Sequence, residues 1–395
     1  MSTVTSDASG GPAGTAAPAS PSLVDRWAEV YNRVGDLRAV AVLRIVLGPV
    51  VLLHLAPLVR EASDGVHYDD HFWNPYASWM PRPSGELWEL SLWVGVVAAV
   101  LMSLGILTRL ATTTTFVVVA GNLLVSTTHF RHNRTFLAIV LGCLALLPVG
   151  HQLSVDAWWR RVRGRAWPTA TSPLWPLMLL RVQVSLVYLA SGISKLVDPD
   201  WFGGLVLWDR VVRYEHHLEP TPLPDWAIDL LTWRPLYFAV APVAVLTEVF
   251  VGAGLWWTRG RLAALWVAFV FHLSIEISAS VEVFSYAAVA ALAIWVTPST
   301  RDRTLALRTD GGGTRLLSRV VWALDWFARF RVVEAEPGAP SVTVVDRDGT
   351  ARTGAAAVAF VLTRLPATFP LLPVLALVGS RRPVGVTASP DASDR

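Results

Sequence analysis

Long apolar runs separated by short polar segments dominate the chain between residues 39 and 297. Eight such runs occupy residues 39–58, 90–107, 110–126, 135–150, 174–194, 236–257, 262–279 and 284–297. A helix needs about 20 predominantly apolar residues, within a range of roughly 17–25, to cross a bilayer. The fourth and eighth runs are short by this measure. The pattern predicts an all-α, multi-pass membrane protein with about eight transmembrane helices, or nine if the apolar stretch 354–379 also crosses.

The polar ends of the chain have different patterns. Residues 1–22 are mostly Gly, Ala, Ser, Thr and Pro and lack the apolar core of a signal peptide. In residues 23–38, apolar and charged positions recur at helical spacing, which is typical of an interfacial helix that lies along the membrane surface. Residues 341–353 alternate around an Asp-Gly turn and predict a β-hairpin, followed by a helix. We therefore expect four parts: a disordered tail (1–22), a transmembrane domain (23–298), a linker (299–340) and a small α+β tail (341–395).

The basic residues of the predicted loops predict the orientation. With the N-terminus inside, thirteen basic residues lie on the cytoplasmic side and eight on the opposite side. Cytoplasmic loops of membrane proteins carry an excess of Arg and Lys. We therefore expect a protein of the cell membrane with both termini cytoplasmic, the small C-terminal tail as a cytoplasmic appendix, and the long loop 198–234 outside.

Composition supports the same class. The chain of 395 residues is 53% hydrophobic and only 16% charged. Soluble domains carry about 25% charged residues. The predicted partner of this chain is therefore the lipid bilayer. A net charge of +3 is too balanced for a nucleic-acid binder, and a single cysteine, Cys143, excludes a disulfide framework. The 33 basic residues include one lysine, Lys195, and such Arg-rich usage is typical of GC-rich bacterial genomes.

The segment SGISKLVDPDWFGG (191–204) carries the strongest candidate chemistry, at the end of the fifth run. A lysine partly removed from water loses part of its preference for the charged form, and a neutral amine can act as a general base. The alternative is that Lys195 extends to the membrane surface and pairs with Asp198 or Asp200, while Trp201 anchors the segment at the interface. The residues alone leave both interpretations open.

A second candidate lies in the seventh run, FHLSIEISASVEVFSY (271–286). His272 and Glu276 are four residues apart and share one helical face. Ionisable groups inside a membrane are costly and mark a functional site or an internal pair. The two residues either satisfy each other or contribute to a site. Two ligands on one helix do not make a metal centre, and no metal is predicted.

Two polar segments on the predicted outer side hold further histidines. In HFRHNRTF (129–136), His129, His132 and Arg134 face the same side as Lys195, or simply form a polar loop. The first loop, HYDDHFWNPYASWMP (67–81), has a metal-like composition in loop-like surroundings, through His67, Asp69 and His71.

Arginines within the apolar runs need internal acceptors. Arg44 and Arg181 are the clearest cases, and Glu248 in the sixth run is a plausible partner for them. We expect these arginines to have structural roles.

Together these segments resemble the HTTM (horizontally transferred transmembrane) family, the membrane part of vitamin K-dependent γ-carboxylase. The resemblance covers about residues 37–298. It rests on LRIVLG (43–48), HFWNPYASWMPRP (71–83), SLGILTRL (103–110) with HNRTFLAIVLG (132–142), FHLSIEISASVEVFSY and, above all, SGISKLVDPDWFGG.

The resemblance implies a mechanism. In the carboxylases a lysine of this motif deprotonates vitamin K hydroquinone; oxygenation then yields a base strong enough to remove a glutamate γ-proton, and CO2 is added. The lysine corresponds to Lys195 and a later histidine to His272. The family's Trp-Asn-Asn-His stretch corresponds to residues 131–134, so that Arg134 stands at the histidine position, with His132 and Asn133 beside it.

The tail from 344 to 366 resembles the second half of the thioredoxin-like DCC family, without that family's DxxCxxC half. We interpret it as a degenerate remnant without redox activity.

Two functional hypotheses follow. In the first, the protein is a quinone-linked enzyme of the carboxylase and epoxidase type, with Lys195 as base and His272 as its partner. Residues that bind the quinone or the substrate are then His132, Asn133, Arg134, Asp198, Asp200, Trp201 and Glu276. In the second, the protein is a non-enzymatic partner or maturation factor for secreted peptides.

Overall fold

The computed structural model describes residues 22–32, 34–65, 73–165, 171–213, 223–278, 281–296, 301–308 and 311–379. The N-terminal tail and the candidate metal residues of the first loop, His67, Asp69 and His71, lie outside the described residues.

Six helices are long and apolar enough to cross a membrane, so the chain is a multi-pass membrane protein. They are α2 (Arg38–Ser63), α3 (Gly85–Leu104), α4 (Thr108–Val125), α7 (Trp175–Leu196), α11 (Tyr237–Gly254, preceded by the 3-10 turn η5, Arg234–Leu236) and α12 (Arg261–Ser278). The predicted membrane class and largely helical fold are confirmed, whereas the count of about eight spans is not.

The two short runs explain the difference. The fourth run forms α5 (His132–Ala145), which has 14 residues and therefore a length of about 21 Å. The eighth run forms α13 (Phe284–Ala291) and the 3-10 turn η6 (Leu292–Trp295). Half of α5 is buried against other helices, so it packs as an internal helix. The stretch 354–379 is bent by 110° between α15 (Gly354–Leu362) and the pair η7 (Pro366–Leu371) and α16 (Leu372–Gly379).

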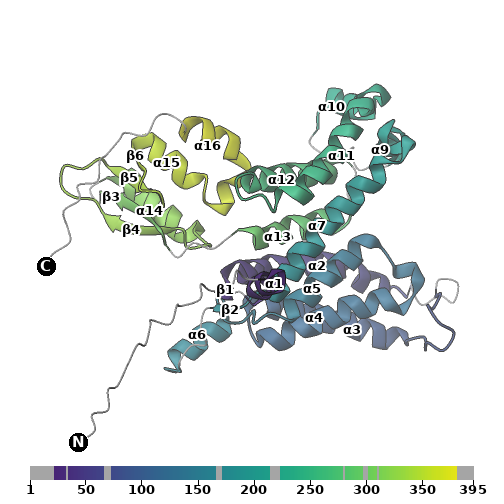
Figure 1. Cartoon of the computed structure of the whole chain (residues 1–395). Helices are drawn as coiled ribbons and strands as arrows, with labels where there is room; N and C mark the ends of the chain where they lie inside the picture. Colours follow the sequence, from purple (N-terminus) through teal and green to yellow (C-terminus); the bar gives the residue numbers. More distant parts are fainter. Residues whose placement is uncertain are drawn as a thin grey trace, which may run out of the picture.

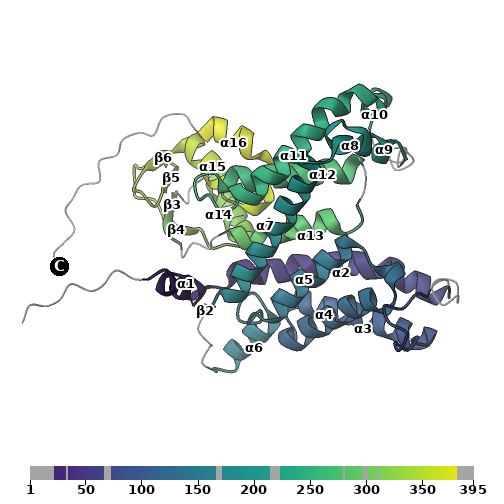
Figure 2. The same ribbon diagram turned by 45° about the vertical axis from the view of Figure 1, so that its right-hand side comes forward.

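The membrane helices form two groups joined by α7 (Figure 1). Helices α2 to α5 pack side by side as one bundle, and α7 crosses from it to α11 and α12 (Figures 1 and 2). Buried residues of α2, α3, α4, α5, α7, α11, α12 and α13 belong to one continuous hydrophobic core. The site described below lies between α7, α11 and α12.

Short elements gather at the two ends of the helices (Figures 1 and 2). One end carries α1 (Leu23–Tyr31), the paired strands β1 (Val34–Asp36) and β2 (Thr171–Pro173), α6 (Val155–Val162) and the C-terminal unit. The other end carries a helical cap formed by α8 (Pro199–Phe202), α9 (Leu205–Arg213) and α10 (Asp225–Thr232), and the 3-10 turn η3 (Thr127–His129) precedes α5. Segments predicted to be cytoplasmic therefore share one end.

Two polar side chains fix the first bundle. Arg44, fully buried in α2, donates hydrogen bonds to the carbonyl oxygens of Met102, of Ser103 at 2.9 Å and of Leu153 at 2.6 Å. Asp156 of α6 accepts from both backbone N–H groups that begin α4, at 3.0 and 2.8 Å. The Asp156 contact satisfies N–H groups that the start of a helix leaves unpaired, and Arg44 joins the end of α3 to the loop before α6.

Helices α7 and α11 approach closely because glycines face the opposite helix. A Cβ added to Gly192 would lie 2.8 Å from Val249 Cγ2, and one added to Gly252 would lie 2.7 Å from Leu189 Cγ. Small residues allow this approach in membrane helix pairs. The two backbones therefore pack with no space for an intervening side chain.

The C-terminal unit is a mixed sheet with helices. Strands β3 (Arg303–Leu307) and β4 (Phe330–Glu334) are parallel and joined by α14 (Gly312–Leu324), and β5 (Val342–Val345) and β6 (Ala351–Thr353) form an antiparallel hairpin beside β3. The predicted hairpin and the helix after it are present as β5, β6 and α15. Because β3 and β4 come from the segment expected as a linker, the described sheet extends across residue 340 without a boundary there.

Candidate functional site

Lys195 lies at the end of α7 in a buried ion pair. Its Nζ is 2.6 Å from Oε1 of Glu248 on α11, and the side chains are 19% and 8% exposed. Ser191 donates to the same oxygen at 3.2 Å. The ring of Trp201, which follows in α8, lies 4.6 Å from Nζ and covers the ammonium by a cation–π contact. The charge is thus held between one carboxylate and one aromatic face.

The partner of Lys195 differs from the two expected acids. Asp198 caps α8, where its Oδ1 accepts from the backbone N–H groups of Asp200 at 3.0 Å and Trp201 at 3.4 Å, and Asp200 is exposed. An N-cap carboxylate satisfies the first turn of its own helix. Pairing of Lys195 with Asp198 or Asp200 is therefore not observed.

Glu248 was expected to serve the arginines of the apolar runs, and it does not. Arg44 is bonded to backbone carbonyls as described above, and Arg181 donates to the carbonyl oxygen of Ile294 at 2.6 and 3.1 Å. These acceptors are available because the last carbonyls of a helix have no partner within it. Both arginines thus bond to the backbone, as the expected structural roles require.

His272 is buried and bonded to a tyrosine of α7. Its Nε2 lies 2.6 Å from the Tyr188 hydroxyl, and the ring meets those of Tyr188, Phe271 and Phe284 edge to face. The expected mutual pairing of His272 with Glu276 is not observed. Glu276 instead accepts from the Tyr286 hydroxyl at 2.9 Å.

The two contacts share one seam between α7, α11 and α12. Tyr188, Ser191 and Lys195 are three and four residues apart and line one face of α7. Two buried polar atoms at this seam, Oε2 of Glu248 and Nδ1 of His272, have no hydrogen-bond partner among the described residues. Buried polar atoms are rarely left unpaired in folded proteins. Both atoms therefore keep a hydrogen-bonding capacity that no described side chain uses.

The stretch 131–134 forms a separate cluster at the start of α5. Arg134 Nε is 3.3 Å from Glu282 Oε2, whereas His132 is exposed against Phe130 and Asn133 is half-buried. Phe284 lies between this cluster and His272, since its ring contacts those of His272 at 5.5 Å and Phe136 at 5.7 Å. The structure does not join Arg134 directly to Lys195.

His129 and Glu276 belong to neither polar contact of the seam. His129 stacks on Trp88 at 5.6 Å and its Nδ1 lies 3.3 Å from the Asn122 carbonyl oxygen. Within the described ranges, no three His, Cys, Asp or Glu side chains gather as a metal site would require.

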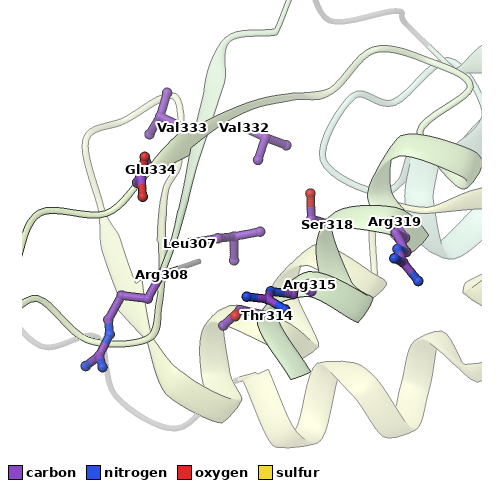
Figure 3. A pocket seen from close by; sticks show the side chains of 9 residues that line it. All are labelled: Leu307, Arg308, Thr314, Arg315, Ser318, Arg319, Val332, Val333 and Glu334. Carbon is purple, nitrogen blue, oxygen red and sulfur yellow. The ribbon is translucent and has the colours of Figure 1, made fainter. Parts of the chain in front are cut away.

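A cavity of about 390 Å³ in the C-terminal unit lies between β3, β4 and the first turns of α14. Figure 3 shows Arg308, Thr314, Arg315, Ser318 and Arg319 around it. No cysteine lines it, so this part of the unit lacks the thiols of a dithiol centre.

From the sequence, Glu248 is assigned to the arginines and not to Lys195, and Tyr188 is not singled out. Glu248 is the one acid in the sixth run, a signal that could have linked it to the one lysine. Tyr188 precedes Lys195 by seven residues and therefore lies on the same face of α7.

One comparison with known proteins identifies the membrane part. The family model described as the HTTM domain matches residues 32–299. No curated protein and no solved structure matches the chain.

Proposed function

Because the chain belongs to the HTTM domain family, whose relation to the carboxylases makes quinone chemistry the leading hypothesis, we propose that it is a quinone-linked membrane enzyme. Lys195 and Glu248 act together as its general base. The observation that carries the proposal is the 2.6 Å contact between Nζ and Oε1 inside the helix bundle. A lone lysine in an Arg-rich chain is thereby held against a lone acid of the facing helix.

The pair can present a neutral amine without changing its total charge. One proton moves from Nζ to Glu248 Oε1 along the existing hydrogen bond and leaves Lys195 as a free amine. That amine then accepts the proton of a substrate hydroxyl, which returns Lys195 to the ammonium form beside a neutral Glu248, so that the positive pair faces the newly formed substrate anion. Low local polarity favours this neutral arrangement, because separated charges are costly away from water.

The seam suits a reduced quinone. When bound, such a group supplies the electrons and the acidic hydroxyl of the reaction. Trp201 offers an aromatic face beside Nζ, and the unpartnered Oε2 of Glu248 accepts a hydrogen bond from a hydroxyl. Nδ1 of His272 offers a second polar contact for the ligand or its substrate. These residues bind and orient the group, while the surrounding apolar side chains exclude water.

The Tyr188–His272 hydrogen bond is a positioning contact in this proposal. It holds Nε2 of the imidazole at the tyrosine hydroxyl, so that Nδ1 points away from the tyrosine. With the cap side of the bundle facing outward, the site takes a secreted peptide or protein as its substrate.

Lys195→Arg tests the base. Arginine keeps the charge and can pair with Glu248, but it does not deprotonate at any useful pH. We expect quinone-dependent turnover by the purified protein to fall by at least about 10²-fold, the range of general-base contributions, while the unfolding midpoint changes little. A fully active Arg variant contradicts the proposal.

A second candidate function is a non-enzymatic membrane partner for secreted peptides. Two observations favour it: Lys195 is fully paired with Glu248, and Arg134, at the carboxylase histidine position, is paired with Glu282. Under this alternative the Arg variant retains peptide maturation in cells, because the ion pair survives.

The C-terminal unit supports the interpretation as a thioredoxin-like remnant through its topology. A β3–α14–β4 unit with parallel strands precedes the β5–β6 hairpin and α15, so the domain begins near residue 301. We propose that it has lost dithiol chemistry, since a single cysteine, Cys143 in α5, is present in the whole chain.

A further inference from the structure

A second, larger cavity lies between the membrane helices and the C-terminal unit. Its volume is about 510 Å³, within the range of small-molecule sites. The membrane side is formed by the first two turns of α2, the start of α12 and the end of α13 with η6; the opposite side is formed by 326–329, Arg347 and 363–370. Figures 1 and 2 both show the C-terminal unit beside α12 and α13.

Four arginines and no acid line this cavity in the described part of the chain. They are Arg261, Arg329, Arg347 and Arg364, and the remaining lining is almost entirely apolar. The nearby acids are already engaged, one of them with Arg347 of the cavity lining. Asp302 binds Arg303 and Arg347, Asp346 binds Arg303 at 2.8 Å, and Asp325 accepts from the backbone N–H groups of Arg329 and Phe330.

Within the described ranges, two of the guanidinium groups, those of Arg329 and Arg364, make no direct ion pair, although Asp325 and Asp346 lie near enough to act on them electrostatically. Arg364 contacts only the Thr363 hydroxyl, at 3.4 Å, and lies over the Phe360 ring. The Arg329 side chain has only an aromatic contact, 6.0 Å from the Phe327 ring centroid. Burial and the neighbouring Arg303, Arg364 and Arg347 lower the pKa of Arg329 to about 10. It therefore remains protonated at neutral pH, and the cavity carries unbalanced positive charge.

The position and rim of the cavity indicate where its counter-ion comes from. Leu262 and Trp326 line it and are 37% and 40% exposed. On the adjoining η7 and α16, Leu371, Val374 and Leu377 are exposed apolar residues. Phe369 and Pro370 of η7 pack on α12, through Phe269 and the Trp266 indole N–H. The charged cavity therefore opens beside an exposed apolar surface of the kind that a bilayer can cover.

We propose that this cavity binds an anionic phospholipid from the bilayer, with its phosphate on Arg329 and Arg364 and its acyl chains along α12 and η7. A phosphate supplies the negative charge that the cavity lacks, and planar guanidinium groups bind phosphate oxygens in pairs. Basic pockets between membrane helices and a cytoplasmic unit are suited to such headgroups. The lipid thereby joins the C-terminal unit to the membrane domain.

Lipid binding to the full-length protein in detergent tests the proposal. Native mass spectrometry and the thermal unfolding midpoint are measured with added phosphatidylglycerol, with phosphatidylcholine, and with inorganic phosphate. We expect one retained phosphatidylglycerol and a raised midpoint, and neither effect with phosphatidylcholine or phosphate. An equal effect of phosphatidylcholine overturns the charge argument, and an equal effect of inorganic phosphate assigns the site to a free anion instead.

Arg364→Gln is the main variant, because the Arg364 side chain makes one long hydrogen bond and one ring contact among the described residues, and we expect the unit to remain folded without them. A lost charge-assisted hydrogen bond corresponds to roughly a tenfold or larger rise in the lipid Kd. Arg331→Gln is the matched control, an exposed arginine of β4 that lines neither cavity. Unchanged binding by Arg364→Gln and by Arg329→Lys/Arg364→Gln, or equal loss in Arg331→Gln, overturns the proposal.

Discussion

The Lys195–Glu248 pair makes a double-mutant cycle informative about both folding and chemistry. The variants are Lys195→Met, Glu248→Met and the double variant, in which two apolar side chains of similar length meet between α7 and α11. Each single variant leaves one ionisable group inside the bundle without its partner. The double variant leaves none.

The expected magnitudes follow from burial. Removing one member of a buried pair costs about 3–5 kcal/mol, whereas replacing both with apolar residues is often close to neutral. Glu248 is 8% exposed and Lys195 is 19% exposed, and Lys195 can reach toward the membrane surface. We therefore expect Lys195→Met, which isolates Glu248, to cost roughly 3 kcal/mol of unfolding free energy. Glu248→Met should cost less, and the double variant about 1 kcal/mol or less.

Reversible unfolding in mixed detergent micelles measures these differences, and the 19 tryptophans of the chain provide the fluorescence signal. These losses imply a coupling free energy of at least about 2 kcal/mol, at the upper end of what residues in direct contact show. If the double variant instead loses the sum of the two single losses, the residues are not coupled and the reasoning is refuted. Turnover should be lost in all three variants, which separates the chemical role of the pair from its effect on stability.

Two further predictions concern orientation and helix capping. The first uses single cysteines in a Cys143→Ala background. A cysteine at Ser78 should react with an impermeant thiol reagent in intact cells, and one at Gly164 should not, because Arg-rich segments such as 160–165 are expected to stay in the cytoplasm. The reverse labelling pattern would show that the orientation is inverted. Asp156→Ala should lower the unfolding free energy by about 1–2 kcal/mol through loss of the α4 cap, and a loss below about 0.5 kcal/mol would show that water replaces this cap.

The positions of the helices could be predicted from the sequence because hydrophobic patterning is local. Each of the eight apolar runs contains a helix, and the Asp348-Gly349 turn lies in the predicted hairpin. Crossing the membrane is a stricter condition than being apolar. Helix α5 is apolar because it is buried among other helices, and hydropathy does not distinguish that burial from contact with lipid.

The partners of the site residues could not be predicted, because they depend on packing between distant segments. Lys195 and Glu248 are 53 residues apart, and Tyr188 and His272 are 84 apart. Local spacing instead suggested His272 with Glu276 and Lys195 with Asp198 or Asp200. In both cases the nearer acid bonds elsewhere, to Tyr286 or to the start of its own helix. Spacing identifies a shared face but not the helix that it meets.

The glycine contacts between α7 and α11 have a mechanical consequence. At Gly192 and Gly252 the neighbouring side chains of the opposite helix lie where a Cβ would stand, and packed interiors resist deformation. We therefore expect the two helices to move together. A change of detergent or a thicker bilayer should then leave the spacing of the two backbones, and with it the Nζ to Oε1 contact, largely unchanged.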